Sequence, residues 1–213
     1  IKDFHGQPII AYSIKAAINS GCFEKIIVST DDQDIASVAK EFGAEVPFER
    51  PAEISDDFTT TIDVIQHAIG WCEAQGWQFD KVCCVYATAP FISSAYITQG
   101  LNFLEDHDID YAFSATSFSF SIQRGFYIDE AGVVSMLQPE HTNTRSQDLQ
   151  EAYHDAGQFY WGKVSAFRAG LPFFANHSKP VLIPRKRVQD IDTTEDWDYA
   201  EKMFELLKNE CLF

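Results

Sequence analysis

Short apolar runs alternate with segments of helical periodicity along this chain. This alternation limits the possible fold classes more than any other pattern in the sequence. The runs that predict strands lie at 25–30, 81–86 and 111–116. The helical segments around them begin near Pro8, Asp31, Thr59 and Ser93. An order of strand, helix, strand, helix is typical of an α/β protein with a mostly parallel sheet and helices on both faces.

The hydrophobic pattern also predicts where individual strands lie. The run at 81–86 is the most apolar and is expected to be central, because strands buried on both faces are continuously hydrophobic. Residues 46–48 predict a short edge strand, and 158–161 and 181–183 predict two later strands. A final helix over 195–208 is expected to close the fold. At 213 residues, the chain suits one domain with a sizeable core.

The net charge of −16 limits the partners that this chain can have. A surface so acidic repels phosphate backbones and anionic lipids, so we expect no nucleic acid partner and no membrane partner. An anionic substrate must then meet a local cluster of cations or a bound metal ion.

The cysteines and the hydropathy of the sequence indicate the cellular compartment in which the protein is expected. The five cysteines are odd in number and form no C-x-x-C pair, which argues against a disulfide framework and a zinc site. This usage favours a reducing cytoplasm. The sequence also shows no apolar run long enough to span a membrane and no signal peptide, so we expect a cytoplasmic protein.

Two aspartates near the end of the chain are the strongest candidates for chemistry. In an extended segment Asp190 and Asp192 point the same way, while Ile191 turns into the protein. Paired carboxylates repel each other, and oxygen ligands of this kind suit Mg²⁺, which is often held by one or two carboxylates together with substrate phosphates. The alternative is a plain strand-to-helix turn, with Thr193 or Thr194 as the helix cap and solvated acidic residues in the first turn.

Polar residues follow three of the predicted strands. Residues 29–31, 86–88 and 190–192 all lie at such carboxyl ends. Ligands of α/β sheets bind outside the carboxyl ends of the strands. These segments therefore predict a binding site at that edge of the sheet.

The regular alternation stops between residues 118 and 153. This segment is rich in aromatic residues and contains a predicted hairpin turn at 129–132, but it has no helix of its own to cover it. We interpret it as a dimerisation arm that packs on a second copy of the chain. The alternative is a hairpin that lies over the parent sheet.

Five segments then carry a resemblance to a known family. They occur in this order: 26–31, 50–53, 57–61, the T-x-P turn at 88–90, and 190–193. Together they resemble the cytidylyltransferases that activate eight- and nine-carbon ulosonic acids, the CMP-sialic acid synthetase family. The resemblance covers nearly the whole chain, and its specificity lies in the ordered set rather than in any one segment.

Two segments narrow the resemblance to one branch. Residues 86–90 read Tyr-Ala-Thr-Ala-Pro where sialic acid enzymes tend to have Leu-Gln-Pro-Thr-Ser-Pro. Residues 154–162 stand where those enzymes have an Arg-Pro-Asn-Gly pattern. Both segments look like the branch that activates pseudaminic acid, whose product feeds the decoration of flagellin and surface glycans in bacteria.

The resemblance implies a fold and a reaction, and the sequence differs from the family pattern at one point. The fold is a Rossmann-like nucleotide-diphospho-sugar transferase sheet, and the assembly is a homodimer. The reaction joins CTP and a nine-carbon sugar acid to give a CMP-sugar and pyrophosphate, with Mg²⁺. The family opens with a strand and a basic, glycine-containing phosphate loop, whereas this sequence begins at Ile1, just after that point. We expect the intact protein to contain the loop.

The resemblance also implies roles for individual residues. Asp190 and Asp192 would be catalytic and would hold Mg²⁺. The positions that would contact the nucleotide are Arg50, Thr60, Thr61, Tyr86 and Thr88. Those that would contact the sugar are Tyr86, Thr88, Arg124, Arg145, Asp155, Gln158 and Tyr160, with the two arginines near its carboxylate.

Each of these positions also has a structural interpretation. Arg50 could pair with Glu49 or Glu53 in its loop, and Thr60 and Thr61 could cap a helix. Arg124 and Arg145 could be surface arginines, or one could reach the neighbouring subunit's site. Phe159 and Tyr160 alternate on a strand, so one of them is core.

Three other functions stay open from the sequence. The first is the same chemistry on another ulosonic acid, such as sialic acid, legionaminic acid or Kdo. The second is a sugar-1-phosphate nucleotidyltransferase, which would depend on a phosphorylated sugar. The third is a non-catalytic binding or assembly module of the same fold, which would lack the upstream phosphate loop.

Overall fold

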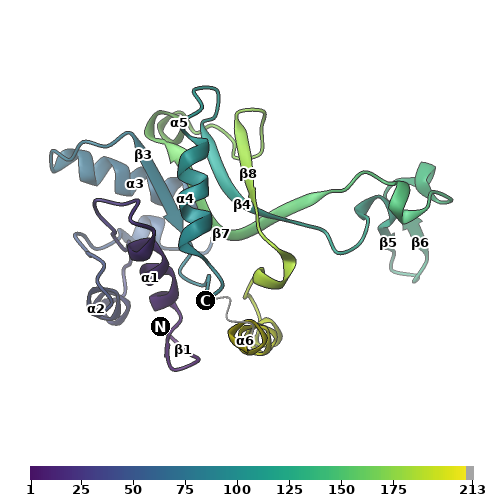
Figure 1. The fold of residues 1–213 in the computed structure, drawn as a ribbon, viewed down its shortest axis with the longest axis horizontal. Helices are drawn as coiled ribbons and strands as arrows, with labels where there is room; N and C mark the ends of the chain where they lie inside the picture. Colours follow the sequence, from purple (N-terminus) through teal and green to yellow (C-terminus); the bar gives the residue numbers. More distant parts are fainter. Residues whose placement is uncertain (210–213) are drawn as a thin grey trace.

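A computed structural model of the chain describes residues 1–209, and it contains six α-helices within that range (Figure 1). The helices are α1 (Ile10–Ser20), α2 (Gln33–Glu41), α3 (Thr61–Ala74), α4 (Ser94–Phe103), α5 (Val164–Ala169) and α6 (Thr194–Asn209). The strands are β1 (Asp3–Phe4), β2 (Gln7–Pro8), β3 (Lys81–Val85), β4 (Tyr111–Ser117), β5 (Phe126–Ile128), β6 (Val134–Met136), β7 (Tyr153–Lys163) and β8 (Ser178–Leu182).

The main sheet has four strands in the order β3-β7-β4-β8. β4 and β8 are parallel, whereas β7 is antiparallel to both β3 and β4. β3, β4 and β8 therefore share one direction, and β7 alone opposes them. This arrangement confirms an α/β fold in which most strands point the same way. The antiparallel insertion was not predicted, because a hydrophobic pattern marks a strand without giving its direction.

Helices cover both faces of the sheet, as the alternating pattern predicted. On one face α1 and α4 pack over Ala112, Phe159 and Trp161, and on the other α3 and α5 pack over Tyr111. The two helix layers lie on opposite sides of the strands in Figure 1. Gly100 of α4 permits the close approach, since a Cβ there would lie 2.7 Å from the Trp161 ring. Phe159 is thus a core residue.

Three predictions about strands were wrong. The apolar run at 81–86 forms β3, but β3 lies at the edge of the four-stranded sheet rather than at its centre. Residues 25–30 form no regular strand and make a single parallel bridge between Ile27 and Glu45. Residues 46–48 lie beyond that bridge and are not a strand. Short apolar runs predict burial more securely than they predict a hydrogen-bonding partner.

The segment between β4 and β7 forms an arm that extends away from the sheet (Figure 1). Its β5–β6 hairpin is antiparallel and turns at Asp129, whose carboxylate accepts hydrogen bonds from the backbone N–H of Ala131 and Val133 at 2.9 and 2.8 Å. The predicted hairpin is confirmed. The alternative in which it lies over the parent sheet is wrong for this structure.

The C-terminal part runs from β8 through a short 3₁₀ turn, Arg185–Arg187, into α6. Thr193 and Asp196 form the helix cap, because the Thr193 hydroxyl accepts from the Asp196 N–H while the Asp196 carboxylate accepts from the Thr193 N–H. Both the final helix and its threonine cap are confirmed. None of the helices within residues 1–209 is long and apolar enough to cross a membrane.

The cysteines that the structure describes are Cys22, Cys72, Cys83 and Cys84, and all four are free thiols. Cys211 lies outside the described residues.

Candidate functional site

Asp190 and Asp192 lie in the irregular segment between the 3₁₀ turn and α6, which bends at Asp192. Both side chains are exposed, while Ile191 packs against the core cluster that includes Phe4 and Trp197. The predicted inward position of Ile191 is therefore confirmed. The expectation that the last strand delivers the two aspartates directly was wrong, because β8 ends at Leu182 and the 3₁₀ turn intervenes.

The pKa of Asp190 is raised above its usual value. Partial burial is the largest cause, and the negative charges of Asp192, Asp155 and Asp196 add to it. A Cβ placed on Gly157 would lie 3.9 Å from Asp190 Oδ1, so the start of β7 passes beside this carboxylate. The structure thus brings Asp155, Asp190 and Asp192 into one acidic centre at the carboxyl end of β4.

The acidic centre offers a metal few protein ligands. Within residues 1–209 no group of three or more His, Cys, Asp or Glu side chains is placed to hold a metal ion. Two carboxylates, completed by substrate phosphates and water, are nevertheless a common environment for Mg²⁺. Burial is the largest cause of the raised pKa of Asp190, and the repulsion from Asp192, Asp155 and Asp196 that adds to it is what a cation would relieve. Asp190 and Asp192 therefore fit a metal that binds together with a nucleotide.

Asp155 is oriented by its own strand. Its Oδ1 accepts from the Gly157 N–H at 2.9 Å, and its Oδ2 accepts from the Tyr160 hydroxyl. Gly157 has φ +61°, a conformation that suits glycine, and it turns the chain so that both bonds can form. Tyr160 is buried, and this burial, followed by the Asp155 carboxylate, raises its pKa well above the usual value. Tyr160 is therefore a fixed hydrogen-bond donor that positions Asp155.

Tyr86 links the nucleotide and sugar positions expected from the sequence. Its hydroxyl lies 2.9 Å from the Thr61 hydroxyl, and its ring packs on Tyr160 with centroids 5.4 Å apart. Both backbone polar groups of Tyr86 are hydrogen-bonded. Its N–H donates to Gln158 O, and its carbonyl oxygen accepts from the Ser13 hydroxyl at 2.7 Å. Sequence reasoning missed Ser13, although a serine on the buried face of a helix was an available signal.

Gln158 lies in the protein interior rather than on the surface of a sugar pocket. Only 3% of it is exposed, and its Nε2 donates to the Arg187 carbonyl oxygen. Arg187 is buried as well, and its Nη1 donates to Phe91 O at 3.1 Å. Gln158 therefore anchors the 3₁₀ turn that precedes the acidic pair. This role corrects the sequence expectation that Gln158 faces the sugar directly.

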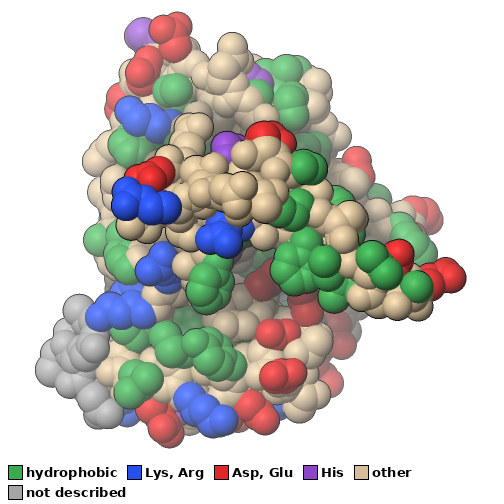
Figure 2. Space-filling view, turned by 90° about the vertical axis from the view of Figure 1, so that its right-hand side faces the viewer, with side chains coloured by type: hydrophobic (Ala, Val, Ile, Leu, Met, Phe, Trp, Pro, Cys, Tyr) green, Lys and Arg blue, Asp and Glu red, His purple; other side chains and the backbone are tan. Residues whose placement is uncertain are grey.

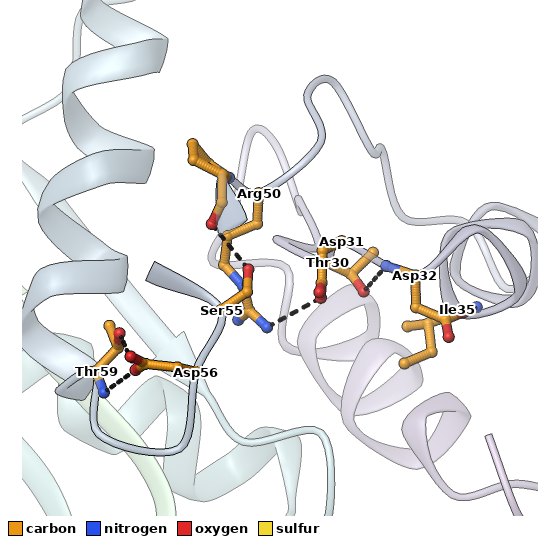
Figure 3. A network of polar contacts seen from close by, with 9 residues as sticks. Thr30, Asp31, Asp32, Ile35, Arg50, Ser55, Asp56 and Thr59 are labelled. Carbon is orange, nitrogen blue, oxygen red and sulfur yellow. Dashed lines mark hydrogen bonds and ion pairs between the residues drawn. The ribbon is translucent and has the colours of Figure 1, made fainter. Parts of the chain in front are cut away.

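Arg50 belongs to a polar network between the loop after Glu45 and the start of α2 (Figure 3). Its Nη2 lies 3.4 Å from the Asp31 carboxylate, and its Nε donates to the Ser55 hydroxyl at 3.0 Å. The Arg50 N–H also donates to Thr30 O, which ties the loop to the end of the 26–30 segment. The structural alternative for Arg50, an ion pair within its loop, named the wrong partner, because the carboxylate that Arg50 pairs with is that of Asp31.

The two threonines at the start of α3, the N-cap Thr60 and the first helical residue Thr61, make different contacts. Thr60 is the N-cap, and with Asp63 it forms a capping box in which each side chain satisfies the other's backbone N–H. Thr61 turns inward to Tyr86. The cap interpretation is thus confirmed for Thr60, while Thr61 faces the site. Thr88 is exposed in the turn after β3.

Arg124 and Arg145 both lie on the arm. Arg124 Nη1 donates to the Ser146 hydroxyl at 3.4 Å, and Arg145 makes a 2.8 Å ion pair with Asp148. The arm extends away from the acidic centre of its own chain (Figure 1). A single chain therefore does not bring these arginines together with Asp155 and Asp190.

The geometry defines an α/β protein in which Asp190 lies beside Asp155, Asp192 and the start of β7, while Tyr86 connects Thr61 with Tyr160. The family profile described as cytidylyltransferase matches residues 1–206. The chain is also 40% identical to a pseudaminic acid cytidylyltransferase from Campylobacter jejuni over 97% of its own length and 89% of that protein. It therefore belongs to the cytidylyltransferase family, which consists of nucleotidyltransferases.

More distant relatives agree with this family. The chain is 29% identical to a CMP-N,N'-diacetyllegionaminic acid synthase from Legionella pneumophila, covering 94% of this chain and 87% of that protein. A solved CMP:2-keto-3-deoxy-manno-octonic acid synthetase complexed with CTP superposes with a TM-score of 0.68, at 12% identity, over 96% of this chain and 90% of that one. At that identity the likeness shows the fold alone.

Proposed function

We propose that this protein activates pseudaminic acid, converting CTP and the sugar acid into CMP-pseudaminic acid and pyrophosphate. The observation that carries the proposal is the acidic centre of Asp155, Asp190 and Asp192 at the carboxyl edge of the sheet. The similarity to the Campylobacter enzyme over nearly the full chain supports the choice of sugar. Cytidylyltransferases generally depend on a divalent metal, and we propose Mg²⁺ because the available ligands are carboxylate oxygens.

The reaction is a displacement at the α-phosphorus of CTP. The anomeric hydroxyl of the sugar attacks, its oxygen forms the new phosphorus bond, its proton is lost, and pyrophosphate leaves with the electrons of the broken bond. When bound, the metal supplies charge neutralisation at the phosphate oxygens and acidifies a coordinated hydroxyl. Asp190 and Asp192 hold that charge in place, and catalysis then rests on alignment of the two substrates.

The remaining residues divide between the two substrates. Arg50, Thr60 and Thr61 would contact the cytosine and ribose of the nucleotide. Tyr86 and Thr88 would lie between the nucleotide and the sugar, since Tyr86 touches both Thr61 and Tyr160. Asp155 would contact the sugar, with Tyr160 and Gln158 positioning the surrounding backbone and carboxylate. The phosphate loop expected before Ile1 stays a prediction.

The arm supports the proposal of a homodimer. Its hairpin exposes 56–67% of Phe126, Tyr127 and Ile128, and more than 60% of Val133 and Val134. Figure 2 looks onto the side from which the arm extends and shows several groups of hydrophobic side chains among charged and other residues on that side. A patch of this kind on an extended arm favours burial against another chain. Arg124 and Arg145 would then enter the sugar site of the neighbouring subunit.

The proposal is tested by identifying the product. The full-length protein is incubated with CTP, Mg²⁺ and one sugar acid at a time, and the CMP-sugar is measured by mass spectrometry. We expect efficient conversion of pseudaminic acid, and conversion of sialic acid, legionaminic acid or Kdo that is at least about 100-fold slower per unit concentration. Preference for another acid would overturn the branch, and conversion of a sugar-1-phosphate instead would overturn the reaction.

A further inference from the structure

The 3₁₀ turn before the acidic pair contains a buried arginine. Arg187 is 7% exposed, although its turn lies between β8 and the exposed segment that carries Asp190 and Asp192. A buried cation loses the water that would solvate its charge, so its burial is unfavourable unless hydrogen bonds and nearby charge compensate. An apolar side chain of similar length would avoid this cost. The guanidinium at position 187 therefore calls for a specific explanation.

Arg187 belongs to a closed circuit of hydrogen bonds. The Tyr86 N–H donates to Gln158 O at 2.9 Å, and Gln158 Nε2 donates to Arg187 O. Arg187 Nη1 then donates to Phe91 O at 3.1 Å. Tyr86 and Phe91 are the two ends of the turn that follows β3, so the chain itself completes the circuit. These four residues are called the Arg187 circuit below.

The Arg187 circuit joins the three segments that carry the proposed site. The first is the turn after β3, with the exposed Thr88, and the second is the first half of β7, with Asp155. The third is the 3₁₀ turn that leads to the acidic pair. An apolar contact links the first segment to the third, because Ile191 packs against the core cluster that contains Phe91. Polar and apolar contacts therefore couple the position of the turn to that of the acidic pair.

The segment that carries the acidic pair is attached to α6 at its other end. The Asp196 carboxylate accepts from the Thr193 N–H at 2.9 Å and from Gln189 Nε2 at 3.1 Å. The Arg187 circuit supplies the attachment on the side of β8. A site holds its geometry when the residues behind it are fixed by packing and hydrogen bonds. Attachment at both ends gives the two aspartates a defined position relative to the turn after β3.

We propose that Arg187 is a positioning residue, which holds the turn after β3 against the segment of the acidic pair and so fixes the separation of the groups that bind the two substrates. The inference rests on the proposed function, because that reaction requires alignment of a hydroxyl with the α-phosphorus. Arginine suits this role, since its guanidinium presents several donors in one rigid plane. Arg187 touches neither substrate and acts through Gln158 and Phe91.

The first test compares Arg187→Met and Arg187→Lys with the wild-type protein in steady-state kinetics. Arg187→Met keeps the length of the side chain but removes its donors, so kcat should fall about 10- to 100-fold while the KM values for CTP and the sugar acid stay within about twofold. Arg187→Lys can still donate to Phe91 O and should remain within about fivefold of the wild-type kcat. An unchanged kcat in Arg187→Met would overturn the inference.

Arg168→Met is the matched control for these substitutions. It removes an arginine from an exposed ion pair with Glu73 on α5 and should leave both kcat and KM at the wild-type values. An equal loss of kcat in Arg168→Met and Arg187→Met would show that the loss does not depend on the circuit, and the inference would fail.

A double-mutant cycle tests whether the circuit acts as a unit. Gln158→Met removes the bond to Arg187 O and should also lower kcat without raising KM. The double variant should lose no more than the weaker single variant, because residues of one hydrogen-bond network are not additive. Losses that multiply would show two independent effects and would refute the circuit. Should Arg187→Met fail to fold, Gln158→Met alone must show the selective loss of kcat for the inference to stand.

Hydrogen exchange measures the positioning itself and does not depend on activity. In Arg187→Met the backbone amides of residues 86–92 and 188–193 should exchange at least about fivefold faster than in the wild-type protein, while those of β4 keep their rates. Equal exchange in the two proteins, or faster exchange throughout the sheet, would overturn the inference, because neither result is a local release of these two segments.

The failure of the proposed function can be recognised separately. In that case the wild-type full-length protein would form no CMP-sugar from CTP and any of the sugar acids. Hydrogen exchange would then decide the inference alone. A local increase in Arg187→Met would show that the circuit holds the two segments, and no increase would show that it does not.

Discussion

At the scale of the residue, the negatively charged form of Asp190 is destabilised in the folded protein, and this property is relevant to the proposed metal site. Its pKa is raised by partial burial and by Asp192, Asp155 and Asp196. A carboxyl whose pKa is higher in the folded than in the unfolded state destabilises the fold once the pH exceeds both values, and this penalty disappears as the pH falls through them. Around neutral pH the acidic centre therefore opposes folding, as sites built for a cation commonly do.

Asp192→Asn should separate folding from activity. The change removes one negative charge next to Asp190, so the pKa of Asp190 should fall toward its ordinary value and the Tm at pH 7 should equal or exceed that of the wild-type protein. Cytidylyl transfer should fall about 100-fold or more, because the proposed metal loses a ligand.

Thermal melts at pH 7 and pH 3.5, together with initial rates, check this prediction. The Tm advantage of Asp192→Asn should shrink at the lower pH, because Asp190, whose pKa is raised, loses its negative charge there. Asp198→Asn, an exposed aspartate in α6, is the control for a simple change of net charge. A variant with near-normal activity in Mg²⁺ would show that Asp192 is not a metal ligand.

The residues of the site were only partly predictable from sequence. Asp190, Asp192 and Tyr86 were expected at the carboxyl edge, because the order of strands and turns is visible in the pattern. Asp155 was expected near the sugar from the family resemblance alone. The Arg50–Asp31 pair joins residues 19 positions apart, and only the folded backbone brings them together. The inward-facing Gln158 was mistaken for a sugar ligand, since a polar side chain in a strand gives no sign of its partner.

At the scale of the element, the N-cap of α3 leads to a prediction about the stability of the fold alone. Thr60→Ala removes the hydroxyl that accepts from the Asp63 N–H, so the free energy of unfolding should fall by about 1 kcal/mol. Denaturant titration measures the change. Thr60→Ser keeps the cap and should match the wild-type protein, and an equal loss in both variants would show that the capping bond contributes little.

The exposed hairpin of the arm leads to a prediction about the proposed homodimer. Ile128 and Val134 are paired in register and share a face of the hairpin, so a charge at 134 would lie in the proposed dimer interface. Val134→Glu should weaken the dimer at least about tenfold, because a buried unpaired carboxylate is costly. Ala131→Glu in the turn adds the same charge outside the paired strands and should leave assembly intact.

Light scattering after gel filtration measures the mass of each variant over a range of concentrations. A wild-type protein that stays monomeric at tens of micromolar would contradict the role given to the arm. Equal weakening by Val134→Glu and Ala131→Glu would mean that added charge, rather than the hairpin face, decides assembly.

The positions of the helices could be predicted from the sequence, whereas the order and direction of the strands could not. Of the six helices within residues 1–209, all but the short α5 (Val164–Ala169) were predicted, because apolar spacing, threonine caps and the glycine at the end of α1 all act locally. The position of β3 at an edge and the antiparallel course of β7 depend on which strands meet in space. Hydrophobicity along one strand carries little of that information.

At the scale of the whole molecule, the net charge bears on how the proposed reaction can occur. The chain is strongly acidic, and Asp155, Asp190 and Asp192 add negative charge at the carboxyl end of β4. The acidic centre suits a metal with phosphates. An anionic substrate at this edge of the sheet would therefore depend on the charge of the proposed metal.

Pyrophosphate release tests this account most directly. The full-length protein is assayed with CTP, Mg²⁺ and pseudaminic acid, with each of the three omitted in turn and with sialic acid as the comparison. We predict release that requires all three components and that is abolished by Asp192→Asn in a folded protein. Release without the sugar acid, or no release from the complete mixture, would contradict the claim that this edge of the sheet catalyses transfer of CMP to an ulosonic acid.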